Sequence, residues 1–279
     1  MGRRPGGAIH AATSRHRRHG HRCRIGCLER SAPGADARQD QAARRPGVGT
    51  KADYKPFGFR DPKGAIVGFE PDLAKDVADR LGVRLELEPV VSANRMQFLQ
   101  QGKIDLMIAT MNVTDERRKT VGIIEPSYYA SGVNVLANRK VALKRWEALK
   151  GQKVCGIQGA FFNKYVAEKY GADIVAFRGQ NEAETALSQG NCIAWLYDDT
   201  AFMERLADPR WAGFEMPLET ILSEPWGAAV KREERDGPWG QFVAKIVADW
   251  HRSGKLIALE KKWNIVPSAF LEKAHAEAK

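Results

Sequence analysis

Two groups of polar residues each follow an apolar segment of the chain, and the two groups carry opposite charges. The first follows residues 104–108 and includes Arg117, whereas the second follows residues 192–196 and includes Asp198 and Asp199. A guanidinium group can bind a carboxylate through two parallel hydrogen bonds, and a carboxylate can accept hydrogen bonds from an ammonium group. Together the two groups offer the complement of a zwitterion such as a free amino acid.

Thr114 stands three residues before Arg117, in a position suited to a helix N-cap. A helix that began there would direct its free N–H groups and the positive end of its dipole toward the same carboxylate. Thr110 and Asn112 precede it and add further polar groups. The alternative interpretation is a capped surface helix whose Arg117 is solvated and binds nothing.

The elements that must position these groups occur twice, about 88 residues apart. Residues 77–87 and 166–176 each read as the end of a helix, a glycine and a strand, and residues 99–108 and 187–196 repeat that order. Strands that alternate with helices form parallel α/β sheets, and the repeat predicts two similar lobes rather than one large sheet. Because ligands bind beyond the carboxyl ends of such strands, the two polar groups are predicted to lie on opposing lobes.

Five motifs resemble the periplasmic amino-acid-binding proteins of ABC importers, solute-binding protein family 3. In chain order they are Gly49-Thr-Lys-Ala-Asp-Tyr-Lys-Pro-Phe57, Gly68-Phe-Glu-Pro-Asp-Leu-Ala74, Gly102-Lys-Ile-Asp105, Asn112-Val-Thr-Asp-Glu-Arg117 and Glu224-Pro-Trp-Gly227. The resemblance covers residues 48–265 and implies the type II periplasmic-binding-protein fold, with two α/β lobes joined by two crossover strands. Those strands are expected near 131–138 and 225–231. The first lobe then comprises residues 47–137 and 226–279, and the second comprises residues 138–225.

The resemblance also implies roles for single residues. Arg117 is expected to anchor the ligand carboxylate and Asp198 the ligand ammonium group. Tyr54 resembles the aromatic residue that covers the aliphatic part of the ligand, whereas Phe57 is expected in the core. Further expected ligand contacts are Thr110, Asn112 and Thr114 in the first lobe and Gln158 and Phe161 in the second.

Lys51 and Arg95 bear on the side chain of the ligand. Lys51 stands where basic-amino-acid and glutamine binders of the family commonly place aspartate, and Arg95 matches an arginine that glutamate and aspartate binders direct at the ligand. Unpaired like charges beside Arg117 are costly to bury, and a dicarboxylic ligand would neutralise them. Glutamate or aspartate is therefore the favoured ligand. If instead Lys51 is exposed and Arg95 pairs with an acid, neither residue reports on the ligand.

Cys155 and Cys192 fall at the starts of the two echoed strands of the second lobe. Adjacent parallel strands can bring their Cα atoms within the ~5.5 Å that a disulfide needs, and an oxidising periplasm would preserve the bond. We predict a disulfide, and the alternative is two buried thiols. Cys23 and Cys27 lack a second pair of zinc ligands, so we expect no metal and no cofactor.

The net charge of +10 is concentrated at the start of the 279-residue chain. Residues 1–46 hold eleven arginines, no lysine and three acids, which leaves a net charge of +2 for the rest. They contain no apolar run long enough for a signal peptide or a membrane span. A disordered basic arm and a damaged targeting segment compete as explanations, but arginine without lysine favours translation in a wrong reading frame before Gly47. We therefore expect no nucleic-acid partner, and a periplasmic location follows from the resemblance alone.

The expected function is capture of a polar amino acid by hinge closure of a monomer, followed by delivery to an ABC permease in the inner membrane. The chief alternative is an enzyme on the same scaffold, such as a cyclohexadienyl or arogenate dehydratase. Glu125, Glu182 or Glu184 could be proposed as its general acid, but none of them belongs to a recognisable catalytic constellation. A sensor module of a larger receptor ranks lower, because no transmembrane segment follows. We expect a binding protein rather than an enzyme.

Overall fold

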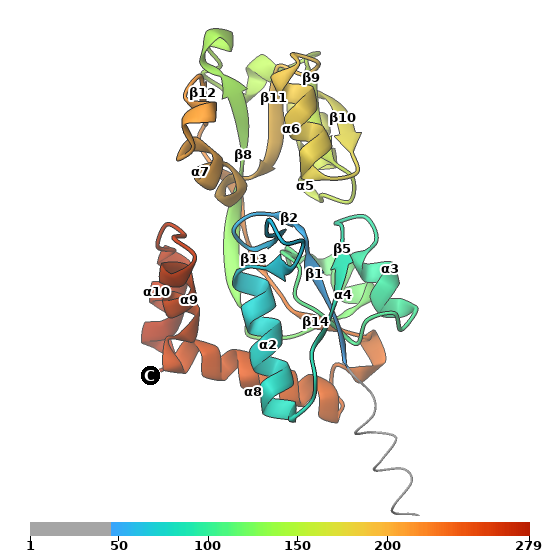
Figure 1. Ribbon diagram of the computed structural model, residues 1–279. Coiled ribbons are helices and arrows are strands. Elements are labelled where there is room, and N and C mark those ends of the chain that lie inside the picture. The colour runs from blue at the N-terminus through green and yellow to red at the C-terminus, as the bar shows by residue number, and fades with distance from the viewer. Residues whose placement is uncertain (1–45) are drawn as a thin grey trace, which may run out of the picture. The chain divides into compact units, whose positions relative to one another are not determined.

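The computed structural model describes residues 46–279, which belong to one compact unit with two α/β lobes (Figure 1). Each lobe is built on its own sheet, as the sequence predicts for this two-lobed fold. The long strand β8 (Tyr129–Asn138) and its antiparallel partner β13 (Ile221–Trp226) run between the lobes. The tail predicted over residues 1–46, with Cys23 and Cys27, lies outside the described residues except for Pro46.

The sheet of the first lobe has the strand order β5-β1-β6-β14-β7. Its strands are β5 (Glu86–Val90), β1 (Gly47–Lys51), β6 (Leu106–Met107), β14 (Ala229–Val230) and β7 (Gly122–Ile123). Strand β1 is parallel to β5 and β6, whereas β14 is antiparallel to β6 and β7. The three parallel strands end at the same edge of the sheet, so the segments that follow them lie side by side at that edge.

Strand β5 begins three residues later than the strand predicted at 83–87, because the residues directly after the preceding helix form its C-terminal cap. Gly82 is left-handed (φ 70°), its N–H donates to the carbonyl of Asp79, and the N–H of Val83 donates to the carbonyl of Ala78. These two bonds form a Schellman motif, which uses the residues directly after the helix. Gly171 ends the equivalent helix of the second lobe with φ 69°, so both predicted glycine caps are confirmed.

The sheet of the second lobe has the order β10-β9-β11-β8-β12, and β13 pairs with β8. Its other strands are β10 (Asp173–Phe177), β9 (Lys153–Ile157), β11 (Ala194–Asp198) and β12 (Phe214–Glu215). Cys155 lies within β9 and pairs in register with Trp195 of β11. Cys192 lies in the turn just before β11, and the two cysteine Cα atoms are 5.6 Å apart in a disulfide bond. The predicted disulfide is confirmed.

The two crossover strands pair with each other along part of their length. Tyr129 and Ala130 of β8 face Trp226 and Pro225 of β13, at the end nearest the first lobe. Residues 133–137 of β8 pair with β11 and therefore belong to the sheet of the second lobe. The chain thus enters the second sheet before residue 138.

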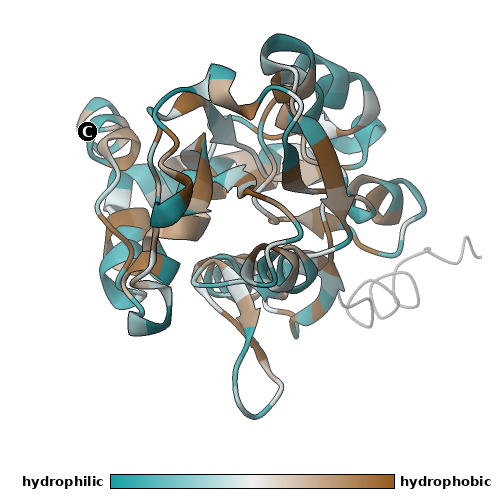
Figure 2. Ribbon diagram, turned by 90° about the horizontal axis from the view of Figure 1, so that it is seen from above, coloured by the Kyte–Doolittle hydropathy of each residue, from teal (hydrophilic) through white to brown (hydrophobic). Residues whose placement is uncertain are grey.

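Helices pack against both sheets. In Figure 2 the hydrophobic (brown) residues are common on the strands, whereas the surrounding helices carry many hydrophilic (teal) residues. Helix α8 (Pro238–Ser253) buries Val243, Ile246, Val247 and Trp250. The helices of the first lobe are α2 (Phe69–Leu81), α3 (Arg95–Gln100), α4 (Asp115–Thr120), α8 (Pro238–Ser253), α9 (Lys255–Lys262) and α10 (Ala269–Glu277). Those of the second are α5 (Phe162–Tyr170), α6 (Gln180–Ser188) and α7 (Asp199–Leu206). The short 3-10 turns are η1 (Arg139–Val141), η2 (Trp146–Leu149), η3 (Pro209–Trp211) and η4 (Arg232–Glu234).

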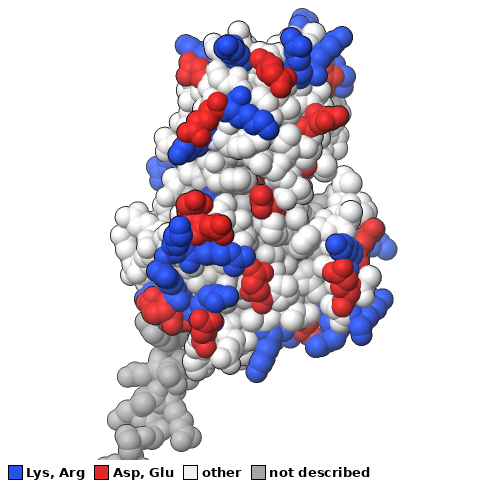
Figure 3. Space-filling model, turned by 180° about the vertical axis from the view of Figure 1, so that it is seen from behind, with Lys and Arg blue, Asp and Glu red and all other residues white. Residues whose placement is uncertain are grey.

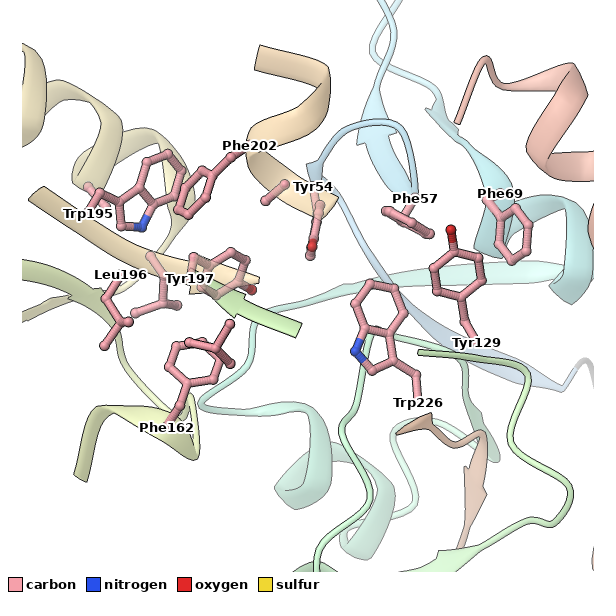
Figure 4. Packing of buried hydrophobic residues seen from close by; sticks show 14 of the residues in the cluster. Tyr54, Phe57, Phe69, Tyr129, Phe162, Trp195, Leu196, Tyr197, Phe202 and Trp226 are labelled. Atoms are coloured by element: carbon pink, nitrogen blue, oxygen red, sulfur yellow. The ribbon is translucent and has the colours of Figure 1, made fainter. Parts of the chain in front are cut away.

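A small antiparallel sheet follows β1 and carries an aromatic cluster to the place where the lobes meet. Its strands are β2 (Asp53–Tyr54), β3 (Gly58–Arg60) and β4 (Ile66–Val67). The ring of Phe57 packs edge to face on Trp226, with ring centres 4.9 Å apart, which confirms its predicted place in the core. Figure 4 shows Tyr54 between this cluster and Tyr197 of the second lobe, whose ring centre is 5.4 Å away.

Positive and negative side chains alternate over the face of the molecule shown in Figure 3. Oppositely charged residues also pair on α2, where Lys75 contacts Asp79 and Arg80 contacts Asp76. This mixture of charges agrees with the small net charge of the chain after Pro46. Among the described residues, no helix combines the length and the apolar composition needed to cross a bilayer.

The disulfide is expected to contribute to the free energy of unfolding. It closes a loop with a sequence separation of 37 residues, for which the loss of chain entropy in the unfolded state corresponds to about 3–4 kcal/mol. We expect the double variant C155A/C192A to lose about that much free energy of unfolding in urea, monitored by tryptophan fluorescence. Treating the wild-type protein with a reductant during unfolding should give the same loss. Equal stability of the two proteins would contradict this prediction.

Candidate ligand-binding site

Arg117 is held at the start of α4, directly after the loop that leaves β6. Thr114 is the N-cap of this helix, and its hydroxyl oxygen accepts a hydrogen bond from the N–H of Arg117 at 3.3 Å. Arg117 as a whole is only 6% exposed, so the alternative of a solvated Arg117 is wrong. Its Nη1 donates to the carbonyl of Asn112 (2.8 Å), and its Nη2 donates to the carbonyl of Gly159 in the second lobe (3.0 Å). Burial, reinforced by the positive charge of Arg95, lowers the pKa of Arg117 to about 9.

Thr110 has an unusual backbone conformation within the same loop. Its φ is +46°, which for a β-branched residue costs on the order of 1–3 kcal/mol. The N–H of Thr110 donates to Glu70 (2.6 Å) and Tyr128 (3.0 Å), and its carbonyl accepts from Arg95 (2.9 Å). The backbone N–H, one of the donors predicted for a ligand, is therefore used within the protein. The Thr110 hydroxyl is buried and has no hydrogen-bond partner among the described residues.

Asp198 is the last residue of β11 and belongs to the second lobe. Its Oδ2 accepts a hydrogen bond from the hydroxyl of Tyr54 in the first lobe at 3.3 Å. Burial, followed by the negative charge of Asp199, raises its pKa to about 7. The neighbouring Asp199 has a different role, because its carboxylate accepts from the hydroxyl of Ser131 (2.8 Å) and the N–H of Gly132 (3.2 Å). Asp198 keeps a buried oxygen, Oδ1, without a hydrogen-bond partner among the described residues.

Lys51 and Arg95 are both buried, which contradicts the alternative of an exposed Lys51. The Nζ of Lys51 lies 3.1 Å from Oδ1 of Asp53, and burial lowers the pKa of Lys51 despite this ion pair. Arg95 donates through Nη1 to the carbonyls of Ala109 and Thr110. Within residues 46–279 no carboxylate lies within ion-pair distance of Arg95, and burial lowers its pKa. The two cations thus keep charge that the protein compensates only in part.

The aromatic residues and Gln158 differ in how well they fit the prediction. Tyr54 is fully buried between the lobes, and its hydroxyl is 2.8 Å from the hydroxyl of Thr200. The ring of Phe161 lies 5.8 Å from the guanidinium carbon of Arg117, within range of a cation–π interaction. Gln158 is exposed, and its amide donates to the carbonyl of Ala176 on the neighbouring strand (3.3 Å). The structure does not bring Gln158 together with the other predicted residues.

Five of the ten predicted residues leave a buried side-chain atom without a hydrogen bond among the described residues. An unsatisfied buried polar atom costs about 1–3 kcal/mol, so several such atoms in one region call for a polar partner. The Nζ of Lys51 is included because it forms an ion pair with Asp53 but makes no hydrogen bond among the described residues. The five atoms are Lys51 Nζ, Arg95 Nε, Thr110 Oγ1, Asn112 Nδ2 and Asp198 Oδ1. They come from both lobes, which places the candidate site between them.

Sequence reasoning missed polar residues that belong to the same region. Gln180, the first residue of α6, is fully buried and has no partner for either atom of its side-chain amide among residues 46–279. Its backbone N–H donates to Oδ2 of Asp53 across the lobes at 3.1 Å. Gln180 follows the carboxyl end of β10, so the rule that located Asp198 could also have found it. Glu70 and Thr50 are likewise buried and carry an unpartnered oxygen.

The residues proposed for catalysis do not gather. Glu125 pairs with Arg118 (2.6 Å) and Glu184 pairs with Arg205 (2.9 Å), while Glu182 is exposed. Within the described residues, no three histidine, cysteine, aspartate or glutamate side chains are placed to hold a metal ion.

Two α/β lobes with buried polar groups facing each other define a two-lobed solute-binding protein. The chain belongs to the bacterial extracellular solute-binding proteins of family 3, whose model matches residues 47–265. It is 35% identical over 221 residues to the glutamine-binding protein of an ABC transporter of Bacillus subtilis (strain 168), covering 77% of this chain and 79% of the relative. It is 29% identical to the lysine/arginine/ornithine-binding periplasmic protein of Escherichia coli (strain K12), covering 77% and 86%. A mutant of ArgBP from T. maritima has a similar structure, with a TM-score of 0.74, 29% identity and coverage of 82% and 97%. The family predicted from the motifs is confirmed.

The raised pKa of Asp198 predicts how stability depends on pH. Its folded pKa of about 7 exceeds the ordinary value, so the stability that the neutral form contributes is complete below about pH 4 and is lost as the pH rises through 7. In the ligand-free protein at pH 8, D198N is expected to raise the free energy of unfolding by about 2–4 kcal/mol, because asparagine stays neutral. The gain should shrink toward pH 4.5.

Urea unfolding at a series of pH values measures this effect. The matched control is D199N, which weakens the acceptor for Ser131 and Gly132 and should destabilise the protein instead. A D198N gain that is absent at pH 8 would show that Asp198 has no raised pKa.

Proposed function

We propose that this protein captures a free amino acid between its two lobes and delivers it to the membrane permease of an ABC importer. The observation that carries the proposal is the placement of buried Arg117 and Asp198 on opposing lobes. Arg117 would bind the ligand carboxylate and Asp198 its ammonium group, each by charge-assisted hydrogen bonds. The matched relatives named for glutamine and for lysine, arginine and ornithine support an amino acid as the ligand class.

Closure of the lobes would enclose the ligand. The sequence predicts one lobe over residues 47–137 and 226–279 and the other over residues 138–225. We propose that these two lobes move relative to each other, and that the second begins nearer 133 because β8 joins the second sheet there. The contacts that join the lobes include Arg117 with Gly159, Tyr54 with Thr200 and Asp198, and Lys55 with Glu204 at 2.7 Å. The N–H of Gln180 also bonds to Asp53 across the lobes. These contacts would form on closing and break on opening. We propose a monomer that works outside the cytoplasm, where an oxidising environment would preserve the disulfide.

Two buried cations near Arg117 support an acidic amino acid as the ligand. Lys51 and Arg95 are fully desolvated, and Arg95 lowers the pKa of both Lys51 and Arg117, so the three positive charges are close enough to repel one another. Asp53 and Glu70 offset part of this charge. A second carboxylate on the ligand would offset more of it. We therefore propose glutamate or aspartate, with Tyr54, Thr110, Asn112, Thr114 and Phe161 completing the site.

Isothermal titration calorimetry with a panel of amino acids tests both parts of the proposal. We expect L-glutamate or L-aspartate to bind with micromolar affinity, about −8 kcal/mol, and at least tenfold more tightly than L-glutamine, L-arginine or L-histidine. R117A should lose at least 100-fold in affinity, because it leaves the ligand carboxylate buried without its partner.

The neighbouring R118A is the matched control, since Arg118 is half-exposed and pairs with Glu125 outside the site. Its affinity should stay within twofold of the wild type. Binding of glutamine or arginine in preference to glutamate would refute the acidic ligand but keep the amino-acid proposal. No heat from any amino acid would refute both.

A dehydratase remains the second candidate function because the site holds a carboxyl group suited to general acid catalysis. Asp198 has a pKa of about 7, near the pH at which a general acid works best. We expect no turnover of prephenate or arogenate when their conversion is followed by absorbance. Turnover that D198N abolishes would replace the binding function by an enzymatic one.

A further inference from the structure

Glu70 is a buried acid at the edge of the candidate site, with Oε1 hydrogen-bonded inside the protein and Oε2 without a partner among the described residues. It lies in the first turn of α2, two residues after Gly68, and is fully buried. Its Oε1 accepts two short hydrogen bonds, from the N–H of Thr110 (2.6 Å) and the hydroxyl of Tyr128 (2.5 Å). A buried carboxylate is retained when it is paired or strongly hydrogen-bonded. One of these bonds comes from the amide of Thr110, in the loop that carries Arg117, and the other comes from Tyr128, whose hydroxyl oxygen accepts from that same amide.

The N–H that Glu70 binds belongs to the residue with the strained backbone. Thr110 is the loop residue with positive φ, a conformation that surrounding bonds must hold in a β-branched residue. Glu70 and Tyr128 bind its N–H, while Arg95 binds its carbonyl from the other side. Asn112, whose carbonyl orients Arg117, follows two residues later. Release of the Thr110 N–H would therefore let the segment that orients Arg117 relax.

We propose that Glu70 is a positioning residue, which locks Thr110 in its left-handed conformation and so keeps the loop up to Arg117 ready for the ligand without touching the ligand itself. This inference rests on the amino-acid site proposed above. Helix α2 supplies no other residue to the site. Through Glu70 it would fix the conformation of the loop after β6.

The charges that face Glu70 make this lock sensitive to pH. Lys51 from β1 and Arg95 from α3 favour its anion, as do the hydrogen bonds from Tyr128 and Thr110, but burial outweighs them and raises its pKa to about 7. A carboxylate accepts a hydrogen bond from an amide more strongly than a neutral acid does. The lock is therefore expected to tighten as the pH rises through 7.

The direct readout is the amide proton of Thr110 in two-dimensional NMR of the ligand-free protein. A hydrogen bond to a carboxylate moves an amide proton downfield, so we expect this resonance at low field and moving further downfield between pH 6 and 8. In E70Q the pH-dependent movement should vanish, because glutamine accepts the bond without titrating. An amide resonance that does not respond to pH in the wild type, or titrates equally in E70Q, would overturn the proposal.

The functional readout is affinity for L-glutamate, with L-glutamine as the second probe. E70A should bind at least 30-fold more weakly than wild type, and E70Q should recover to within about threefold at pH 7.5. Glycine adopts positive φ without strain. In a T110G background the E70A change should therefore cost much less, a coupling that a double-mutant cycle measures.

The matched control is Glu260, another buried carboxylate that accepts a hydrogen bond from a tyrosine, Tyr129, at 2.8 Å, but lies outside the site. E260Q should leave the affinity within twofold. If the wild type binds no amino acid, the proposed function fails, while the Thr110 resonance still tests the lock. If the wild type binds and E70A binds equally well, the proposed function stands and the role of Glu70 is refuted.

Discussion

The burial of charge between the two lobes constrains the rest of this structure. Arg117 and Asp198 are both withdrawn from water, and so are Lys51 and Arg95 nearby. An isolated buried charge is costly, so each of these groups must find a partner in the protein or in a ligand. Carbonyl oxygens serve Arg117 and Arg95, Asp53 serves Lys51, and Tyr54 serves Asp198. The acidic amino acid that we propose as the ligand would complete this arrangement.

In this fold the sheets provide a rigid framework, and the loops at their ends carry the buried polar residues. Parallel strands end at a common edge in each sheet, and the polar residues follow those ends. The disulfide between Cys155 and Cys192 and the aromatic cluster around Trp226 hold the strands themselves. The residues that face the other lobe sit on short loops and helix starts, where backbone groups are free to bind. The sheets therefore carry short polar loops at their ends, an arrangement that suits the lobe closure proposed above.

Residues that lie behind the site hold its charged groups and its backbone in position. Asp198 and Asp199 are adjacent, yet the backbone turns one toward the first lobe and ties the other to Ser131 and Gly132. Glu70 binds the strained Thr110 from a helix that otherwise packs in the core. Such support decides whether a charged group is presented at the correct angle, because a guanidinium group binds a carboxylate well only in a narrow range of geometries.

The linear pattern of residues was sufficient for several features. The echo of helix, glycine and strand predicted two α/β lobes, because a glycine cap and an apolar run are local properties of a chain. The position of Arg117 and Asp198 after apolar segments predicted that they lie on different lobes, and the spacing of Thr114 predicted its cap. The disulfide followed from two cysteines at strand starts.

Other features depended on contacts between distant segments, which no local pattern contains. The burial of Lys51, the carbonyl partners of Arg95 and the outward position of Gln158 were decided by the packing of the lobes. Glu70 lies 40 residues before the amide that it binds, and Gln180 lies 127 residues after Asp53. Sequence determined which chemistry this protein has available. Tertiary structure decided which of those groups are buried together, because desolvation and hydrogen bonding depend on neighbours in space.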